Sequence, residues 1–114
     1  MYLIDGSFPI NGKIRASGNK NAALPCIAAA LLTDEKIILR NVPEIEDVRV
    51  MLEIMSSLGA EVQKDGNGVY EIQTKNIKSP EIPAEHAKHI RASILFAGPL
   101  LARNGKVHLP PPGG

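Results

Sequence analysis

The sequence predicts an α/β fold, in which short strands alternate with helices along a chain of 114 residues. The stretch 45–58 repeats apolar residues at the spacing of a helix that packs on one side. Two short apolar stretches, 60–64 and 69–74, then flank the turn 65–68, which reads Asp-Gly-Asn-Gly. Such turns need residues that tolerate positive φ, so this pattern is typical of a β-hairpin. A helix followed by a hairpin, with a strand candidate at 36–42, indicates a sheet covered by helices.

The remaining elements complete one repeating unit and begin a second. Gly59 is a natural end for the helix at 45–58, and the helix expected at 22–32 is apolar on nearly all sides, which predicts its burial. In chain order we expect two short strands within 1–17, a helix at 22–32, a strand at 36–42, a helix at 45–58, the hairpin, a helix at about 84–103 that Pro99 kinks, and a strand at 106–109. This order is strand-helix-strand-helix-strand-strand, followed by helix and strand again.

The helix at 45–58 has the clearest periodicity in the chain. Asp47 faces away from its apolar stripe, so it is expected to be solvated, with approach to a site as the alternative. The stripe consists of Ile45, Val48, Met51, Leu52, Met55 and Leu58.

Composition excludes several classes of protein. With 44% hydrophobic residues the chain suits a globular domain, and a formal charge of +1 with only 4% aromatic residues argues against nucleic acid as a partner. No apolar run approaches the roughly 20 residues that a membrane span needs. We therefore expect a cytoplasmic protein that binds no membrane.

The segment 17–25, Ser-Gly-Asn-Lys-Asn-Ala-Ala-Leu-Pro, places Lys20 and Asn21 at the start of a helix. A helix start has unpaired backbone N–H groups and partial positive charge, so it can hold a phosphate or carboxylate together with the lysine and the carboxamide. The alternative is a plain capped helix, with Ser17 or Asn19 as the cap and a solvated lysine.

Other chemically able side chains carry weaker signals. Cys26, the single cysteine, permits no intramolecular disulfide and is expected to be a small buried filler without a catalytic role. His86 and His89 lie three residues apart beside Glu85, a spacing that metal ligands can have, but a solvated helix start is the favoured interpretation and no metal site is expected. His108 is expected to be structural or exposed.

Several motifs together resemble the N-terminal part of the UDP-N-acetylglucosamine 1-carboxyvinyltransferase family. They follow in order along nearly the whole chain, which corresponds to about the first quarter of a family member. The motifs are the segment 17–25, Asn41-Val42-Pro43, Leu58-Gly59-Ala60, Arg91-Ala92-Ser93, Gly98-Pro99-Leu100 and Pro112-Gly113-Gly114.

The resemblance implies transfer of the enolpyruvyl group of phosphoenolpyruvate to the 3′-hydroxyl of UDP-N-acetylglucosamine, by addition and then elimination of phosphate. This reaction opens peptidoglycan precursor synthesis, and so serves cell wall formation, cell shape and cell division. It also implies the family's inside-out α/β barrel of repeated units, which is incomplete in this chain. Residues 1–17 would then pack with the other domain, 18–109 would form the first unit and the start of the second, and 110–114 would begin the active-site loop.

The resemblance also assigns site residues. Lys20 and Asn21 match the family's residues for phosphoenolpyruvate, and Arg91 matches its contact to the UDP-sugar, although an arginine on a helix is by itself more often a surface ion-pair residue. The general acid, a cysteine or an aspartate, would follow directly after Gly114, so this chain contains no catalytic residue and is expected to be inactive alone. Its expected partners are the two substrates and the remainder of the same enzyme, with no cofactor.

Two alternatives stay open. The related transferase that acts on shikimate phosphate shares the fold, but serine usually follows its lysine, where this chain has Asn21. A non-catalytic α/β module is the other alternative, because the chain is short. Three consecutive prolines at 110–112, where many family members have fewer, predict a stiffer entry to the loop without bearing on the assignment.

Overall fold

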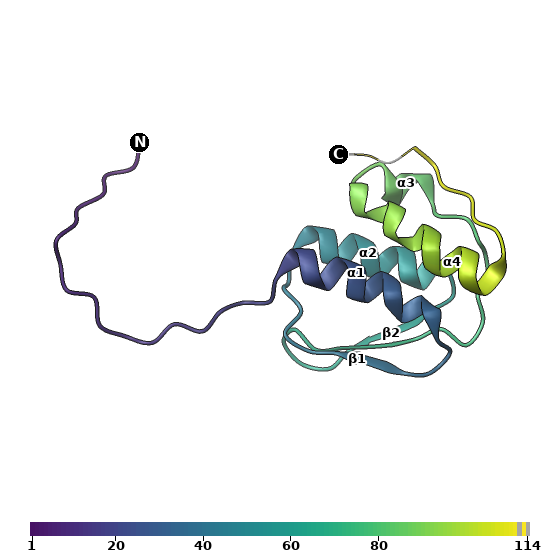
Figure 1. Ribbon diagram of the computed structural model, residues 1–114, viewed down its shortest axis with the longest axis horizontal. Helices are drawn as coiled ribbons and strands as arrows, with labels where there is room; N and C mark the ends of the chain where they lie inside the picture. The colour runs from purple at the N-terminus through teal and green to yellow at the C-terminus, as the bar shows by residue number, and fades with distance from the viewer. Residues whose placement is uncertain (112, 114) are drawn as a thin grey trace.

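The computed structural model describes residues 1–111 and 113, and it shows an α/β arrangement in which helices cover one face of a small sheet (Figure 1). The helices are α1 (Lys20–Ala29), α2 (Glu46–Ser57), α3 (Ala84–Ala87) and α4 (Ala97–Asn104), with the 3₁₀ segments η1 (Ala30–Leu32) and η2 (Arg91–Phe96). The strands are β1 (Ile37–Leu39), β2 (Glu61–Lys64) and β3 (Tyr70–Gln73).

The three strands form one sheet in the order β1-β3-β2, and both pairs are antiparallel. The predicted hairpin is confirmed as β2 and β3, closed by a hydrogen bond from Asp65 N–H to the Val69 carbonyl at 3.0 Å. Gly66 and Gly68 both have positive φ, +77° and +66°, which explains why this turn carries two glycines.

Helices α1 and α2 lie side by side between the sheet and the layer formed by α3, η2 and α4 (Figure 1). This position explains a difference from the sequence prediction for α2. Val50 and Ile54 are buried in addition to most of the expected stripe, because α2 is covered on two sides. Ile45, which was placed on the stripe, precedes the helix and is exposed.

The helix predicted at 22–32 is present as α1 and η1, but its burial was overestimated. Cys26 is exposed, together with Ala22, Pro25 and Ala29, so the expectation of a buried thiol is wrong. The reason is that the neighbours of α1 cover only the side that carries its buried residues, Ala23, Leu24, Ile27 and Ala28.

The expectation of a single kinked helix at 84–103 is wrong, because this region forms three separate elements, α3, η2 and α4. The chain leaves helical geometry at Ile90, where φ is −140° and ψ is 138°. Pro99 causes no break, since it is the third residue of α4, where a backbone N–H has no partner within the helix. The strand expected at 106–109 is reduced to one parallel bridge between Glu81 and His108.

Residues 1–17 form no strand in the structure, contrary to expectation, and they leave the domain as an extended arm (Figure 1). All of their side chains are exposed, including Tyr2, Phe8 and Ile14. Strands need partners to satisfy their backbone groups, and the arm pairs with no other described segment. That this arm packs with a second domain stays a prediction.

Arg103, in the last turn of α4, connects the helices to the sheet through hydrogen bonds. Its guanidinium donates to four backbone carbonyls, those of Leu31, Thr33, Thr74 and Lys75, at 2.7 to 3.2 Å. These carbonyls belong to the end of η1 and the end of β3, so one side chain joins three elements. None of the described helices has the length and apolar character that crossing a membrane requires.

Candidate functional site

The start of α1 is capped by the residue that precedes it. Asn19 is the cap residue, and its side-chain oxygen accepts the N–H of Ala22 at 3.1 Å. The Ala23 N–H donates to the Asn19 carbonyl at 3.0 Å. The first two helical N–H groups, those of Lys20 and Asn21, have no partner within the helix, and both side chains are exposed.

Lys20 projects from this helix start toward α2. Its ammonium forms an ion pair with Asp47, with Nζ and Oδ2 2.5 Å apart, and half of the lysine side chain stays exposed. The lysine is therefore neither free in solvent, as the capped-helix alternative had it, nor enclosed by protein. Asp47 lies in the first turn of α2, and its pairing with Lys20 is the contact that sequence analysis missed.

Asn21 offers an exposed carboxamide one residue further along α1. Its backbone also differs from that of an ordinary helical residue, because Pro25 lies four positions later and has no N–H to donate to the Asn21 carbonyl. Donors and an acceptor thus lie together in the first turn of α1.

Two remote segments fix the position of this helix start. Gly18 lies against the backbone of Asn41, so closely that an added Cβ would be 1.8 Å from the Asn41 carbonyl oxygen. Asn41 has a φ of +56°, an uncommon value for a residue with a side chain. Val42, the next residue, donates its N–H to the carbonyl of Gly68 in the hairpin turn at 2.9 Å.

A shallow groove of about 240 Å³ adjoins the start of α1. Gly18, Asn19 and Ala22 form one side of it, and Arg40 and Asn41 form part of the other. Cys26 also lines this groove, and the lining residues include no histidine that could activate its exposed thiol as a nucleophile.

Arg91 is exposed at the start of η2, which packs against α1. Among the described residues, no hydrogen bond or ion pair joins Arg91 to Lys20 or Asn21. The structure therefore brings Lys20 and Asn21 together at one helix start, and places Arg91 on an adjacent element without direct contact.

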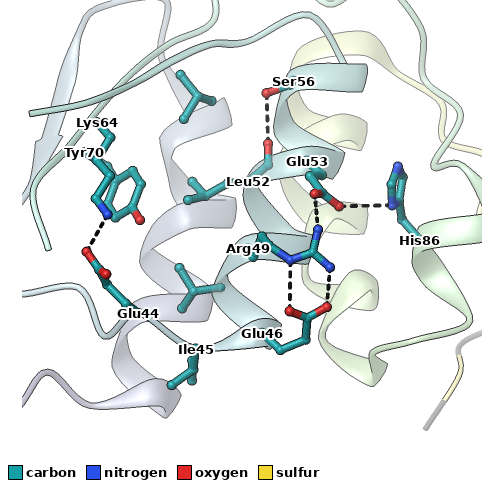
Figure 2. A pocket seen from close by; sticks show the side chains of 12 residues that line it. Glu44, Ile45, Glu46, Arg49, Leu52, Glu53, Ser56, Lys64, Tyr70 and His86 are labelled. Atoms are coloured by element: carbon teal, nitrogen blue, oxygen red, sulfur yellow. Dashed lines mark hydrogen bonds and ion pairs between the residues drawn. The ribbon is translucent and has the colours of Figure 1, made fainter. Parts of the chain in front are cut away.

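A groove of about 720 Å³ lies elsewhere, between α2 and the hairpin (Figure 2). Its floor is apolar, with Val48, Leu52 and Val62, and ion pairs line its rims. On one rim Lys64 contacts Glu44 at 2.6 Å, and this contact is the main cause that lowers the pKa of the Glu44 carboxyl. None of the predicted substrate residues lines this groove.

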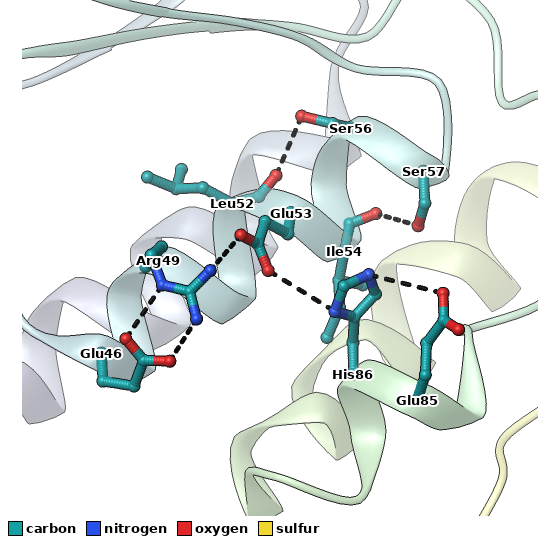
Figure 3. Close-up of polar contacts among 9 residues, drawn as sticks. All are labelled: Glu46, Arg49, Leu52, Glu53, Ile54, Ser56, Ser57, Glu85 and His86. Atoms are coloured by element: carbon teal, nitrogen blue, oxygen red, sulfur yellow. Dashed lines mark hydrogen bonds and ion pairs between the residues drawn. The ribbon is translucent and has the colours of Figure 1, made fainter.

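The opposite rim is a chain of ion pairs along α2 (Figure 3). Arg49 contacts both Glu46 and Glu53, and the Arg49 hydrogen bond is the main cause that lowers the pKa of Glu46. Glu53 in turn faces His86, whose Nδ1 lies 3.5 Å from the carboxylate. His86 is thus half-buried beside carboxylates, whereas sequence analysis expected it in solvent.

Within residues 1–111 and 113, no group of three His, Cys, Asp or Glu side chains is arranged to hold a metal ion. His108 is exposed and contacts Glu81, with Nδ1 and Oε1 3.3 Å apart. The predicted start of an active-site loop at 110–114 falls partly outside the described residues, at Pro112 and Gly114. Gly113 is described, and its N–H donates to the Ala87 carbonyl at 2.9 Å.

The α/β fold is that of an enolpyruvyl transferase, as comparison with known proteins shows. The chain belongs to the family described as EPSP synthase (3-phosphoshikimate 1-carboxyvinyltransferase), which it matches over residues 4–111. It also resembles the enolpyruvyl transferase NikO from Streptomyces tendae, with a TM-score of 0.74 and 28% identity over 83% of this chain and 22% of that one.

Within the family, the chain is most informatively compared with proteins named UDP-N-acetylglucosamine 1-carboxyvinyltransferase. It is 61% identical to that of Treponema denticola and 57% identical to that of Treponema pallidum, each over 113 residues. The match covers 99% of this chain but only 26% and 27% of the two relatives. The chain thus spans about a quarter of their length and matches their N-terminal part.

Proposed function

We propose that this chain is the N-terminal part of a transferase that moves the enolpyruvyl group of phosphoenolpyruvate to the 3′-hydroxyl of UDP-N-acetylglucosamine. The observation that carries the proposal is the half-exposed Lys20 ammonium beside two unpaired N–H groups, in a chain 61% identical to a protein with that name. Phosphoenolpyruvate has a carboxylate and a phosphate, and both are anions that such a helix start can bind.

In this proposal Lys20 neutralises one anionic group of phosphoenolpyruvate and stabilises the charge that shifts during addition. Asn21 binds phosphoenolpyruvate through its carboxamide and lies near the sugar nucleotide. Arg91 contacts the UDP-sugar, whose diphosphate suits a guanidinium. The general acid lies beyond Gly114, so the 114-residue chain alone binds its ligands weakly and does not turn them over.

The proposed reaction requires no cofactor and belongs to peptidoglycan precursor synthesis in the cytoplasm, where it contributes to the cell wall, cell shape and division. Its partners are the two substrates and the remainder of the same enzyme. The related transferase that acts on shikimate phosphate is the second candidate, since the family carries that name. Asn21, where serine would be expected, favours the UDP-sugar enzyme.

A chimera tests the proposal. Residues 1–113 of this chain replace the matching quarter of the Treponema denticola relative, and release of phosphate from phosphoenolpyruvate is measured with each acceptor. We expect release with UDP-N-acetylglucosamine and none with shikimate 3-phosphate. The opposite acceptor preference would support the second candidate, and a folded but inactive chimera would favour a non-catalytic module.

Site variants of this chimera test the residue roles. Lys20→Ala should lower kcat/KM for phosphoenolpyruvate about a hundredfold, the loss typical of removing a group that stabilises transition-state charge. Lys106→Ala removes another exposed lysine, which does not line the groove beside α1, and should leave kcat/KM unchanged. Equal activity of the two variants would remove Lys20 from the mechanism.

A further inference from the structure

Asp47 ties the proposed anion site to a second helix. Its carboxylate lies 2.5 Å from the Lys20 ammonium, with 31% of its side chain exposed, while 50% of the lysine side chain remains open to solvent. Lys20 is the first residue of α1 and Asp47 is in the first turn of α2. The two helices begin at the same end of the domain (Figure 1).

The location of Lys20 is unfavourable for its own helix. The start of a helix carries partial positive charge, so a lysine there is repelled by the helix dipole and a carboxylate is attracted. The first turn of α1 contains no acidic residue, whereas that of α2 contains Glu46 and Asp47. The positive charge at the start of α1 is therefore offset by an acid from the neighbouring helix.

Asp47 is also distinct from the other charged residues of α2. Arg49 pairs with Glu46 and Glu53 on the same helix, along the groove rim seen in Figure 3. Such pairs within one helix contribute only slightly to helix stability. Asp47 instead reaches across to α1, and its partner is the lysine that the proposed function requires.

We propose that Asp47 is a positioning residue, which holds the Lys20 ammonium at the start of α1 so that its remaining N–H groups meet the anionic groups of phosphoenolpyruvate. An ammonium has three donors, and one carboxylate oxygen leaves the others available. A free lysine side chain samples many rotamers, and ordering it on binding costs free energy. Because the ion pair already orders the lysine side chain, less of this free energy has to be spent when the substrate binds. This inference rests on the proposed function of Lys20.

The position of Asp47 predicts opposite effects on binding and on chemistry. A carboxylate beside the anion site repels an approaching anion, so replacing it with a neutral amide should not weaken the binding of phosphoenolpyruvate. The same replacement releases the ammonium from its fixed position, and small misplacements of a charge-stabilising group lower the rate of the chemical step. A purely structural tie between α1 and α2 would lower thermal stability without changing kcat.

The test uses the chimera described above with Asp47→Asn and Asp47→Glu. We expect Asp47→Asn to lower kcat about tenfold with KM for phosphoenolpyruvate unchanged or lower, and Asp47→Glu to restore part of kcat because it keeps the charge. Glu71→Gln is the matched control: its pair with Lys36 is 2.7 Å long and similarly exposed, at 52% and 25%, and it lies on β3. This control should retain both constants.

A double-mutant cycle decides whether Asp47 acts through Lys20. In the Lys20→Ala chimera, adding Asp47→Asn should cause no further loss of kcat. An equal loss in both backgrounds, or an Asp47→Asn variant with normal kcat, would overturn the inference while leaving the role of Lys20 intact. A Lys20→Ala variant with normal activity would overturn the proposed role of Lys20, on which this inference rests. Thermal unfolding of each variant verifies that the compared proteins are folded.

Discussion

Replacing Arg103 with alanine should be among the most destabilising substitutions of a partly exposed residue in this domain. The guanidinium donates to four carbonyls, at 3.0, 3.2, 2.7 and 3.1 Å, that end η1 and β3. A hydrogen bond from a charged donor contributes about 1.5–3 kcal/mol. Because water can reach some of these carbonyls once the side chain is removed, we expect a total loss of about 3 kcal/mol rather than the full sum.

Urea unfolding of the 114-residue chain, followed by circular dichroism, measures this loss. With a slope of about 1.5 kcal/mol per molar urea, a loss of 3 kcal/mol lowers the midpoint by about 2 M. The urea midpoint of Arg103→Lys should fall between those of the wild type and Arg103→Ala, because an ammonium cannot reproduce the planar fork of a guanidinium. Arg40→Ala, which removes an exposed arginine, should leave the midpoint unchanged. A shift below about 0.3 M for Arg103→Ala would refute the reasoning.

Three further outcomes follow from single contacts. Thr74→Val should be neutral or stabilise the domain in the same urea assay, because Thr74 Oγ1 is buried and has no hydrogen-bond partner within the described structure; a clear loss would indicate that the hydroxyl is satisfied. Cys26 should react with a thiol reagent in the native protein without prior unfolding, and protection until unfolding would contradict its exposure. Glu44 has a pKa below its usual 4.5, chiefly through Lys64, so its contribution to stability is present above that pH and is lost as pH falls through the lowered pKa. Glu44→Gln should therefore be less stable than the wild type at pH 7, by a difference that shrinks as the pH falls below 4.5; a difference that grows toward acid would contradict this sign.

The sequence predicted best those elements whose determinants are local. The hairpin turn carries Gly66 and Gly68 where positive φ is needed, and the structure has the turn there. The register of α2 followed from its apolar spacing, but the burial of Val50 and Ile54 did not, because it depends on a second layer that packs on α2.

The failures share a physical cause, since each depends on distant partners. The break at Ile90 has no glycine or proline to announce it, and Pro99 suggested a kink where the helix tolerates proline. Cys26 has apolar neighbours in the sequence, yet no element among the described residues buries its side of α1.

For the candidate site, local pattern was enough to place Lys20 and Asn21 at the start of a helix, and the structure has them there. Their roles in binding stay predictions. The contact between Lys20 and Asp47 joins two helices that are separated by a strand, so no local pattern could reveal it. Arg91 begins η2, whereas sequence analysis placed it inside a single helix at about 84–103.

The glycine contacts around Asn41 have a consequence for synthesis of the protein. The backbone at 41–42 contacts Gly18 on one side and is hydrogen-bonded to Gly68 on the other. A nascent chain that has not yet produced Gly68 lacks the support behind the start of α1, and contacts so far apart in sequence form slowly. Ribosome-bound chains should therefore acquire affinity for phosphorylated ligands only after the hairpin has emerged from the exit tunnel, although Lys20 itself is translated long before.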